Sequence, residues 1–349
     1  MTAPDTGSSL DPATLQPWID EIWEETIVPA LEEYIAIPAK SPAFDADWAA
    51  NGYIDQAVDL IVERCRLFAP DGMTFEVVRL DGRTPVVLME LAASAGLEAM
   101  APVLMYGHLD KQPEMEGWDE DLGPWKPVRK GERLYGRGGG DDGYAAFAST
   151  LALAALVKTG APRPRTVVLI EGCEESGSYD LPFYIEHLAE RIGSPELVVC
   201  LDSGAGDYER LWNTTSLRGL VAGDLSVSVL REGVHSGDAS GVVPDSFRVV
   251  RALLSRLEDE ATGRIADDFH VEVPAGRREQ AERTGEVLGA QVDGKFPFRD
   301  GAHAVPGAPA ELILARTWQP ALSVTGAGGL PALADAGNGS RPRTELKLS

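Results

Sequence analysis

The chain has 349 residues, 44% hydrophobic and 25% charged, a composition that supports a large buried core and favours two domains. Its 55 acidic residues outnumber the 31 basic ones, and the formal net charge is −24. A chain this acidic repels nucleic-acid phosphates and anionic membranes, so we expect neither as a partner. No apolar run approaches the roughly 18 residues that a membrane span needs.

The N-terminal stretch and the cysteines indicate in which cellular compartment the protein is found. The stretch "MTAPDTGSSLDPATLQ" has neither the basic region nor the apolar region of a signal peptide. The three cysteines, Cys65, Cys173 and Cys200, lie among apolar neighbours, and a small odd number of cysteines is typical of reduced thiols. These features predict a cytoplasmic protein.

Up to residue 202, the predicted elements alternate between helices and strands. Helical periodicity predicts helices over 11–37, 48–69, the Ala-rich part of 135–156, and 180–191. Short β-rich runs predict strands over 75–80, 85–91, 103–107, 165–172 and 196–202. This alternation is typical of the α/β class, and we expect a mainly parallel sheet.

The pattern changes near residue 213. Residues 220–231 alternate like an exposed antiparallel strand, and residues 245–260 have the pattern of an amphipathic helix. Residues 261–316 are polar with only short helical pieces, and "ALSVTGAG" and "TELKLS" predict two more strands. We therefore expect a first domain over 1–212 and a smaller α+β domain over 213–349. Because nothing caps the last strand, we also expect the sequence to be C-terminally truncated.

Ionisable side chains follow four of these segments at the point where a strand or glycine run ends. They are His108 and Asp110 after "VLMYG", Asp141 and Asp142 after "GRGGG", Glu174 and Glu175 after "TVVLIEG", and Asp202 after "LVVCL". Singly, each acid is more often an exposed loop residue, but ligands of α/β sheets bind outside the carboxyl ends of strands. Clustered carboxylates repel one another unless a cation lies among them. One imidazole with several carboxylates suits Zn²⁺, with Mn²⁺ or Co²⁺ as substitutes.

The spacing of these side chains suggests how they divide the work. His108 and Asp110 lie on the same side of an extended backbone, so Asp110 can hydrogen-bond the non-ligating ring nitrogen. Glu174 and Glu175 are adjacent and point different ways, so one can bind metal while the other acts as a general base. The glycines at 138–140 could instead form a phosphate loop. That alternative is disfavoured, because no Gly-Lys-Ser/Thr follows and the two aspartates repel phosphate.

Three stretches carry a resemblance to a known family: "YGHLDKQPEMEGWDEDLGPWKPVRKGERLYGRGGGDDG", "EGCEESGS" and "CLDSG". Their order and spacing resemble the co-catalytic zinc peptidase family, which includes carnosine dipeptidase, aminoacylase-1, carboxypeptidase G and succinyl-diaminopimelate desuccinylase. The tract from "GWD" to "ERLYGRG" is most similar to the dipeptidase branch. The resemblance implies that residues 1–212 are the N-terminal part of a catalytic domain. Residues 213–349 would be an incomplete lid domain that mediates homodimerisation.

The resemblance also implies a metal site with two zinc ions per intact active site. His108 and Asp202 would bind the first zinc. Asp141 would bridge the two metals, and Glu175 would bind the second. A cis peptide bond between Asp141 and Asp142 is implied as well.

Further roles follow from the same resemblance. Glu174 would be the general base and acid, and Asp110 would orient the metal-binding histidine. The stretch "REGVHSGDASG" matches a histidine motif of the lid domain, and its His235 would stabilise the oxyanion in the partner's active site. Arg343 lies where the family often has a basic residue near the substrate carboxylate, although it could equally be a surface arginine. Gly143 stands where the family usually has a lysine.

The implied activity is hydrolysis of amide bonds in dipeptides or small peptides. An N-acyl-amino-acid deacylase of the same family is the alternative enzyme. The late histidine that the family uses for its second metal has no match in these 349 residues. A third alternative is therefore an inactive truncated fragment that binds one metal through His108, Asp141 and Asp202.

Overall fold

The computed structural model describes residues 11–349, and the chain divides between Gly204 and Ala205 into two compact units. The expected domain boundary at 212/213 lies in the stretch 201–222, which contains no helix or strand. None of the helices in the described part of the chain is long and apolar enough to cross a membrane. Each unit is described by itself below.

Helices of the first unit begin where the sequence predicts them. The carboxylate of Asp11 accepts the amide of Ala13 and caps α1 (Pro12–Ile22), whose first residue is a proline. This helix continues through a π-helical turn (Trp23–Ile27) into α2 (Val28–Ala36), which confirms the helix predicted over 11–37. The other helices of the unit are α3 (Trp48–Asn51), α4 (Tyr53–Arg66), α5 (Tyr144–Lys158), α6 (Leu181–His187) and α7 (Ala189–Ile192).

The first unit contains a five-stranded sheet in the order β1-β2-β6-β3-β7. The strands are β1 (Thr74–Val78), β2 (Val86–Leu91), β3 (Val103–His108), β6 (Thr166–Glu171) and β7 (Leu197–Cys200). Strand β3 is parallel to both of its neighbours, β6 and β7, whereas β1 pairs with β2 and β2 with β6 in antiparallel fashion. The α/β class is confirmed, and the sheet is mixed.

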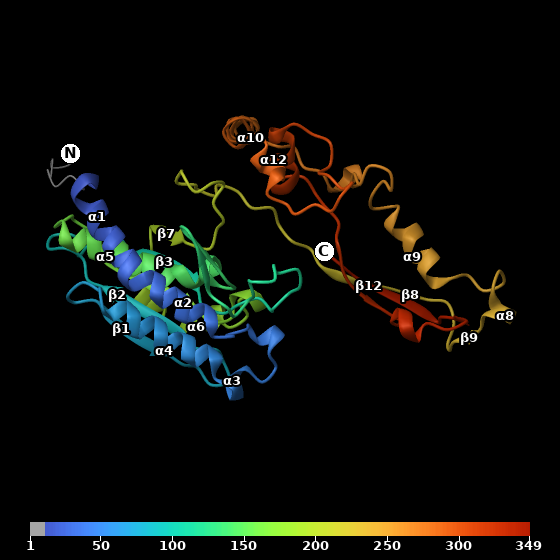
Figure 1. The fold of residues 1–349 in the computed structure, drawn as a ribbon, viewed down its shortest axis with the longest axis horizontal. Helices are drawn as coiled ribbons and strands as arrows, with labels where there is room; N and C mark the ends of the chain where they lie inside the picture. Colours follow the sequence, from blue (N-terminus) through green and yellow to red (C-terminus); the bar gives the residue numbers. More distant parts are fainter. Residues whose placement is uncertain (1–10) are drawn as a thin grey trace. The chain divides into compact units, whose positions relative to one another are not determined.

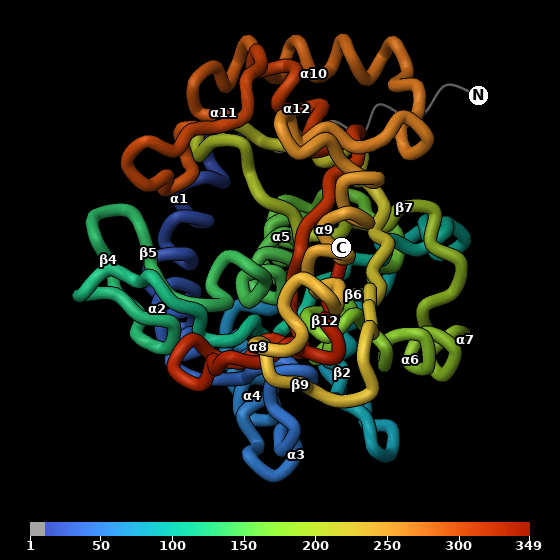
Figure 2. The backbone as a smooth tube through the Cα atoms, turned by 90° about the vertical axis from the view of Figure 1, so that its right-hand side faces the viewer, coloured from blue at the N-terminus to red at the C-terminus, as the bar shows by residue number. Residues whose placement is uncertain are grey.

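The antiparallel pairing of β1 with β2 has a simple cause. Only residues 79–85 join β1 to β2, and a connection this short can join only antiparallel neighbours. The helix–strand alternation therefore indicated more parallel pairing than the sheet contains. A separate hairpin of β4 (Val128–Lys130) and β5 (Arg133–Tyr135) ends the polar stretch that follows β3 (Figure 2).

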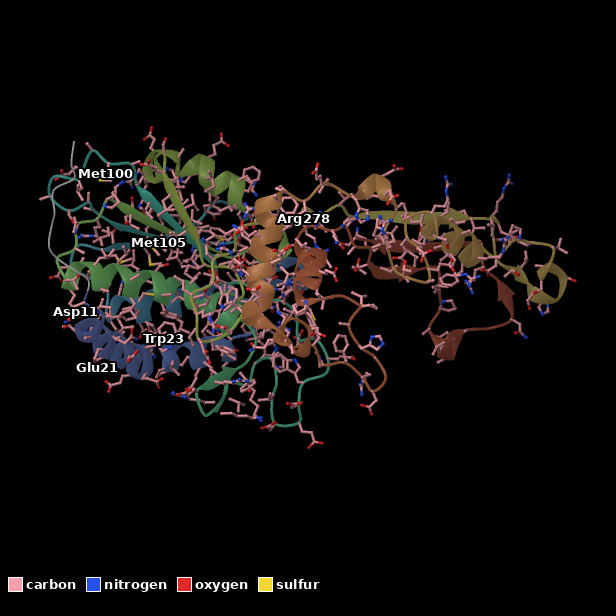
Figure 3. All side chains as sticks on the ribbon, turned by 90° about the horizontal axis from the view of Figure 1, so that it is seen from above. Asp11, Glu21, Trp23, Met100, Met105 and Arg278 are labelled. Carbon is pink, nitrogen blue, oxygen red and sulfur yellow. The ribbon has the colours of Figure 1, made fainter. Side chains whose placement is uncertain are left out.

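Helices cover both faces of this sheet. On one face, α1, α2, α4 and α5 bury a core that includes Met89, and Met105 of β3 packs against it (Figures 1 and 3). On the other face, Tyr184 of α6 and Ile192 of α7 pack with Leu169. Because β3 lies between β6 and β7 and has apolar residues packed on both faces of the sheet, the position of its carboxyl end is well defined.

The second unit is built on a three-stranded antiparallel sheet in the order β10-β12-β8, and a second, two-stranded pairing joins β9 and β11. The strands are β8 (Gly223–Ser228), β9 (Val234–His235), β10 (Val324–Gly328), β11 (Gly339–Ser340) and β12 (Arg343–Leu348). The helices are α8 (Ser236–Ala239), α9 (Ser246–Leu254), α10 (Ala275–Leu288), α11 (Gln291–Gly294) and α12 (Pro309–Thr317). The strands predicted in 220–231 and in the two C-terminal stretches are thus present.

Two helices of the second unit differ from the sequence prediction, and in the first unit the helix predicted over 48–69 is divided at Gly52 into α3 and α4. Helix α9 ends at Leu254, short of the predicted 260, and the acidic run at 258–260 would have met the negative end of a longer helix. Helix α10 has few large apolar residues, so its pattern predicted only short helical pieces, yet it packs against α12. A Cβ at Gly285 would lie 2.8 Å from the backbone nitrogen of Ala310, so a glycine permits this close approach.

Candidate metal centre

The cluster predicted at the sheet edge forms around His108, the last residue of β3, whose side chain is fully buried. Its Nε2 lies 3.1 Å from Oδ1 of Asp141. The same nitrogen lies 3.8 Å from Oδ2 of Asp202 and 3.9 Å from Oε2 of Glu174. Three carboxylates from separate segments thus converge on one ring nitrogen.

Strand direction explains why these groups meet. His108 is level with Glu171 in the parallel pairing of β3 with β6, and Tyr106 is level with Cys200 in β7. The chain segments that leave β6 and β7 therefore start at the same edge. Glu174 begins a 3₁₀ turn (Glu174–Ser176) after β6, and Asp202 comes just after β7.

The carboxylate of Asp110 contacts both the imidazole of His108 and the turn that carries Glu174 and Glu175. It is fully buried, and its Oδ1 lies 3.5 Å from Nδ1 of His108. The nearer partner of that nitrogen is the backbone carbonyl of Asp110, at 3.1 Å. The two carboxylate oxygens accept the backbone amides of Glu174 and Glu175, each at 3.0 Å. Asp110 therefore fixes the turn that carries both glutamates.

The segment before α5 supplies the remaining acids. The peptide bond between Asp141 and Asp142 is cis, as the resemblance implied. The Asp141 side chain is 62% exposed, whereas Asp142 is fully buried and its Oδ2 accepts the amide of His108 at 3.2 Å. Asp141 is thus largely exposed to solvent while one of its oxygens contacts the buried imidazole. Asp142 anchors the segment to β3.

The pKa values reflect this crowding. Burial disfavours a charged His108, but hydrogen bonds with Asp110 and Asp141 outweigh it and raise the pKa of His108 to about 11. The bond to His108 lowers the pKa of Asp141. Burial raises the pKa of Glu174, of Glu175 and of Asp202. It also raises the pKa of Asp142 to about 7. The buried acids thus favour a proton or another cation.

A metal ion fits the donors that are present. One ligand atom each from His108, Asp141 and Asp202 lie within 4.8 Å of one another, and so do atoms of His108, Glu174 and Glu175. Among the described residues, Oε1 of Glu175 is buried without a hydrogen-bond partner. A divalent cation would satisfy this oxygen and remove the repulsion between carboxylates.

Two predicted site residues belong to the second unit. His235 lies in β9 with an exposed ring, and its Nδ1 accepts the amide of Gly237 at 3.0 Å. Arg343 begins β12, and its guanidinium lies 3.7 Å from the carboxylate of Glu345. Within that unit, His235 caps the short helix α8 and Arg343 forms an exposed ion pair.

Several residues support the cluster without any signature in the sequence. Gln112 donates from Nε2 to the carboxylate of Glu175, and the phenol of Tyr144 donates to the carbonyl of Leu201. Lys111 is fully buried beside the metal motif. Its position one residue after Asp110 was the sole clue, and burial of a lysine cannot be read from one sequence.

Comparisons with known proteins agree with the geometry. Residues 104–276 match the model of peptidase family M20/M25/M40. Human Beta-Ala-His dipeptidase is 28% identical over 208 residues, covering 58% of this chain and 39% of that protein. Succinyl-diaminopimelate desuccinylase of Gluconobacter oxydans is 35% identical over 133 residues, covering 37% of this chain and 34% of that protein. The chain therefore spans well under half the length of these two relatives.

The fold also matches solved structures. The crystal structure of human carnosine dipeptidase 1 aligns with a TM-score of 0.66 and 22% sequence identity, covering 96% of this chain and 71% of that chain. The family match includes the segments that carry His108, Asp141, Glu174 and Asp202. On these grounds, residues 104–276, about half of the chain, are a match to peptidase family M20/M25/M40.

Proposed function

We propose that this chain carries the metal-binding part of a hydrolase that cleaves amide bonds in dipeptides or small peptides. The observation that supports this most strongly is the convergence of the Asp141, Asp202 and Glu174 carboxylates on Nε2 of His108. The likeness to Beta-Ala-His dipeptidase supports a small peptide as the substrate.

The proposed metal is zinc, with two ions per intact active site and with Mn²⁺ or Co²⁺ as substitutes. His108 and Asp202 would hold the first ion, Asp141 would bridge, and Glu175 would hold the second. A bound divalent cation would polarise the scissile carbonyl and lower the pKa of a water molecule.

Proton transfer is assigned to Glu174. Its side chain is partly exposed, and burial raises its pKa, which makes it a better proton acceptor near neutral pH. Glu174 would take a proton from the attacking water and deliver it to the nitrogen of the leaving amine. Asp110 would hold Glu174 in place through the backbone amide that it accepts.

The second unit is proposed to be the lid and dimerisation domain of a homodimer. Its His235, with an exposed ring, would stabilise the oxyanion in the partner's site, and Arg343 would bind the substrate carboxylate. The domains are proposed to span 1–212 and 213–349. A cytoplasmic location is proposed because Cys65, Cys173 and Cys200 are all unpaired.

A substitution at Glu174 tests the assignment. Glu174→Gln should abolish turnover of dipeptides while zinc still binds, because the amide cannot accept the proton. Glu186→Gln, a change of the same kind at an exposed position of α6, is the matched control and should keep the parent rate. Turnover of the Glu174 variant at the parent rate would refute the assignment.

A deacylase remains a second candidate, because the desuccinylase of Gluconobacter oxydans is the relative with 35% identity. Rates on a panel of dipeptides and N-acyl-amino acids, measured with the zinc-loaded chain, separate the two functions. Preference for the dipeptides supports the first proposal, and preference for acyl-amino acids supports the second.

A further inference from the structure

Lys111 is fully buried three residues after His108. A lysine is almost never fully buried unless its charge is paired. Within residues 11–349, no carboxylate forms an ion pair with Lys111, and burial lowers its pKa to about 6. A group this costly to bury needs compensation from its other contacts.

The end of helix α2 supplies that compensation. Nζ of Lys111 donates to the carbonyl of Tyr34 at 2.6 Å and to the carbonyl of Ile37 at 2.7 Å. Ile37 is the C-cap of α2, and each carbonyl also accepts one backbone amide: that of Tyr34 accepts the amide of Ile37 at 3.0 Å, and that of Ile37 accepts the amide of Ala39 at 2.8 Å. The second acceptor site of each carbonyl is filled by Lys111. Two N–H donors suffice for these carbonyls, whether or not the amine carries its third proton.

Tyr34 in turn contacts the turn that carries His108 and Asp110. Its hydroxyl donates to the carbonyl of Leu109 at 2.6 Å, between His108 and Asp110. Nζ of Lys111 lies 3.8 Å from the centre of the Tyr34 ring. The end of α2 and the turn after β3 are thus joined in both directions.

The glycine segment, residues 138–143, packs against the same pair. A Cβ on Gly138 would lie 2.6 Å from Cε of Lys111, and a Cβ on Gly143 would lie 2.2 Å from Cε1 of Tyr34. Both glycines therefore allow the segment to approach closer than any other residue could. Asp141 lies within this segment.

From these contacts we infer that Lys111 is a positioning residue that holds the glycine segment, and with it Asp141, against His108. The inference rests on the proposed metal site. Removal of the amine would leave each of the two carbonyls with its backbone amide alone and would loosen the surface on which the segment lies. The donor atoms of Asp141 and His108, now 3.1 Å apart, would then be less well aligned for a metal ion.

The test is titration of the full chain with Co²⁺, followed by its visible absorption spectrum and by the dissociation constant. Lys111→Met keeps the methylene stem and removes the donors. We expect roughly a tenfold or larger rise in the dissociation constant, the range typical of groups that orient metal ligands, together with a changed spectrum. Lys158→Met, which removes an amine on α5 that lies over Trp18, is the matched control and should bind Co²⁺ like the parent.

Tyr34→Phe keeps the ring and loses only the bond to Leu109, so it provides a milder second variant. We expect its Co²⁺ affinity to fall in the same direction but less, with the protein still folded. If the parent binds Co²⁺ and both variants show its affinity and spectrum, the positioning role is overturned while the metal site stands. If the parent itself binds no Co²⁺, the metal site is overturned and the positioning role with it.

Discussion

The phenol of Tyr144 donates a 2.5 Å hydrogen bond to the carbonyl of Leu201. Tyr144 follows the segment that carries Asp141, and Leu201 precedes Asp202. One side chain therefore connects two of the segments that are proposed to supply metal ligands. This bond involves no metal ion, so it joins the two segments before any ion binds.

Tyr144→Phe removes this bond and leaves the ring in place. A net loss of about 1 kcal/mol in unfolding free energy is expected, the usual value for one hydrogen bond. Zinc affinity, measured by isothermal titration calorimetry, should also fall. The loss of binding free energy should exceed the loss of unfolding free energy, because the two segments proposed to carry ligands become uncoupled.

Tyr184→Phe is the control for that experiment, because Tyr184 donates a similar 2.6 Å bond to the carbonyl of Thr84 and also accepts the amide of Leu80 at 3.0 Å. It should lose at least as much stability as Tyr144→Phe and keep its zinc affinity. Equal zinc affinities of the two variants would contradict the coupling role of Tyr144.

Gly143→Ala tests the close packing of the glycine segment. The added Cβ would lie 2.2 Å from the ring of Tyr34, so the segment must move. Overpacking of this kind costs about 1–3 kcal/mol of unfolding free energy, and we expect that loss together with weaker zinc binding. Chemical denaturation and calorimetry measure the two effects.

Gly140→Ala is a control in the same segment, because a Cβ at Gly140 would meet nothing within 4 Å. That variant should keep the stability and zinc affinity of the parent. If Gly143→Ala has the same stability and zinc affinity as Gly140→Ala, the segment is not tightly packed against Tyr34.

The pH dependence of the metal-free protein follows from Glu171. Burial raises the pKa of Glu171 from 4.5 to about 7, against opposing hydrogen bonds from Tyr106 and Ser178. The folded state therefore keeps a proton that the unfolded chain loses above pH 4.5. This contribution to stability is complete below pH 4.5 and is lost as the pH rises to about 7. At about 1.4 kcal/mol per pKa unit, the loss is roughly 3 kcal/mol.

Glu171→Gln cannot ionise and should escape that loss. The melting temperature of the variant relative to the parent, both metal-free, should therefore rise between pH 5 and pH 8. Asp142, whose pKa is also raised to about 7 by burial, titrates in both proteins and cancels in the difference. A constant difference across this range would mean that Glu171 does not titrate in the folded protein.

That His108, Glu174 and Asp202 meet could be predicted from the sequence, because it depends only on strand order and direction. Parallel strands end at the same sheet edge, so residues just after them meet without any knowledge of packing. The partly antiparallel pairing of the sheet did not disturb this, because β6, which precedes Glu174, stays parallel to β3 and pairs in antiparallel fashion only along its other edge, with β2.

Contacts between distant segments could not be predicted in this way. Lys111 and Tyr34 are 77 residues apart, and their hydrogen bond depends on how α2 packs over the sheet. Helix α10 was missed for a related reason. Its contact with α12 depends on small residues such as Gly285 rather than on an apolar stripe, and small residues give no periodic signal.

His108 and the acids around it are proposed to form a metal site. Zinc titration of the purified, chelator-treated chain, compared with His108→Gln, tests this most directly. We expect saturable zinc binding by the parent. In the variant, zinc affinity should fall by more than the roughly 100-fold that is typical when a group that only orients the ligands is removed. Absence of zinc binding by the parent, or equal affinity of parent and variant, would contradict it.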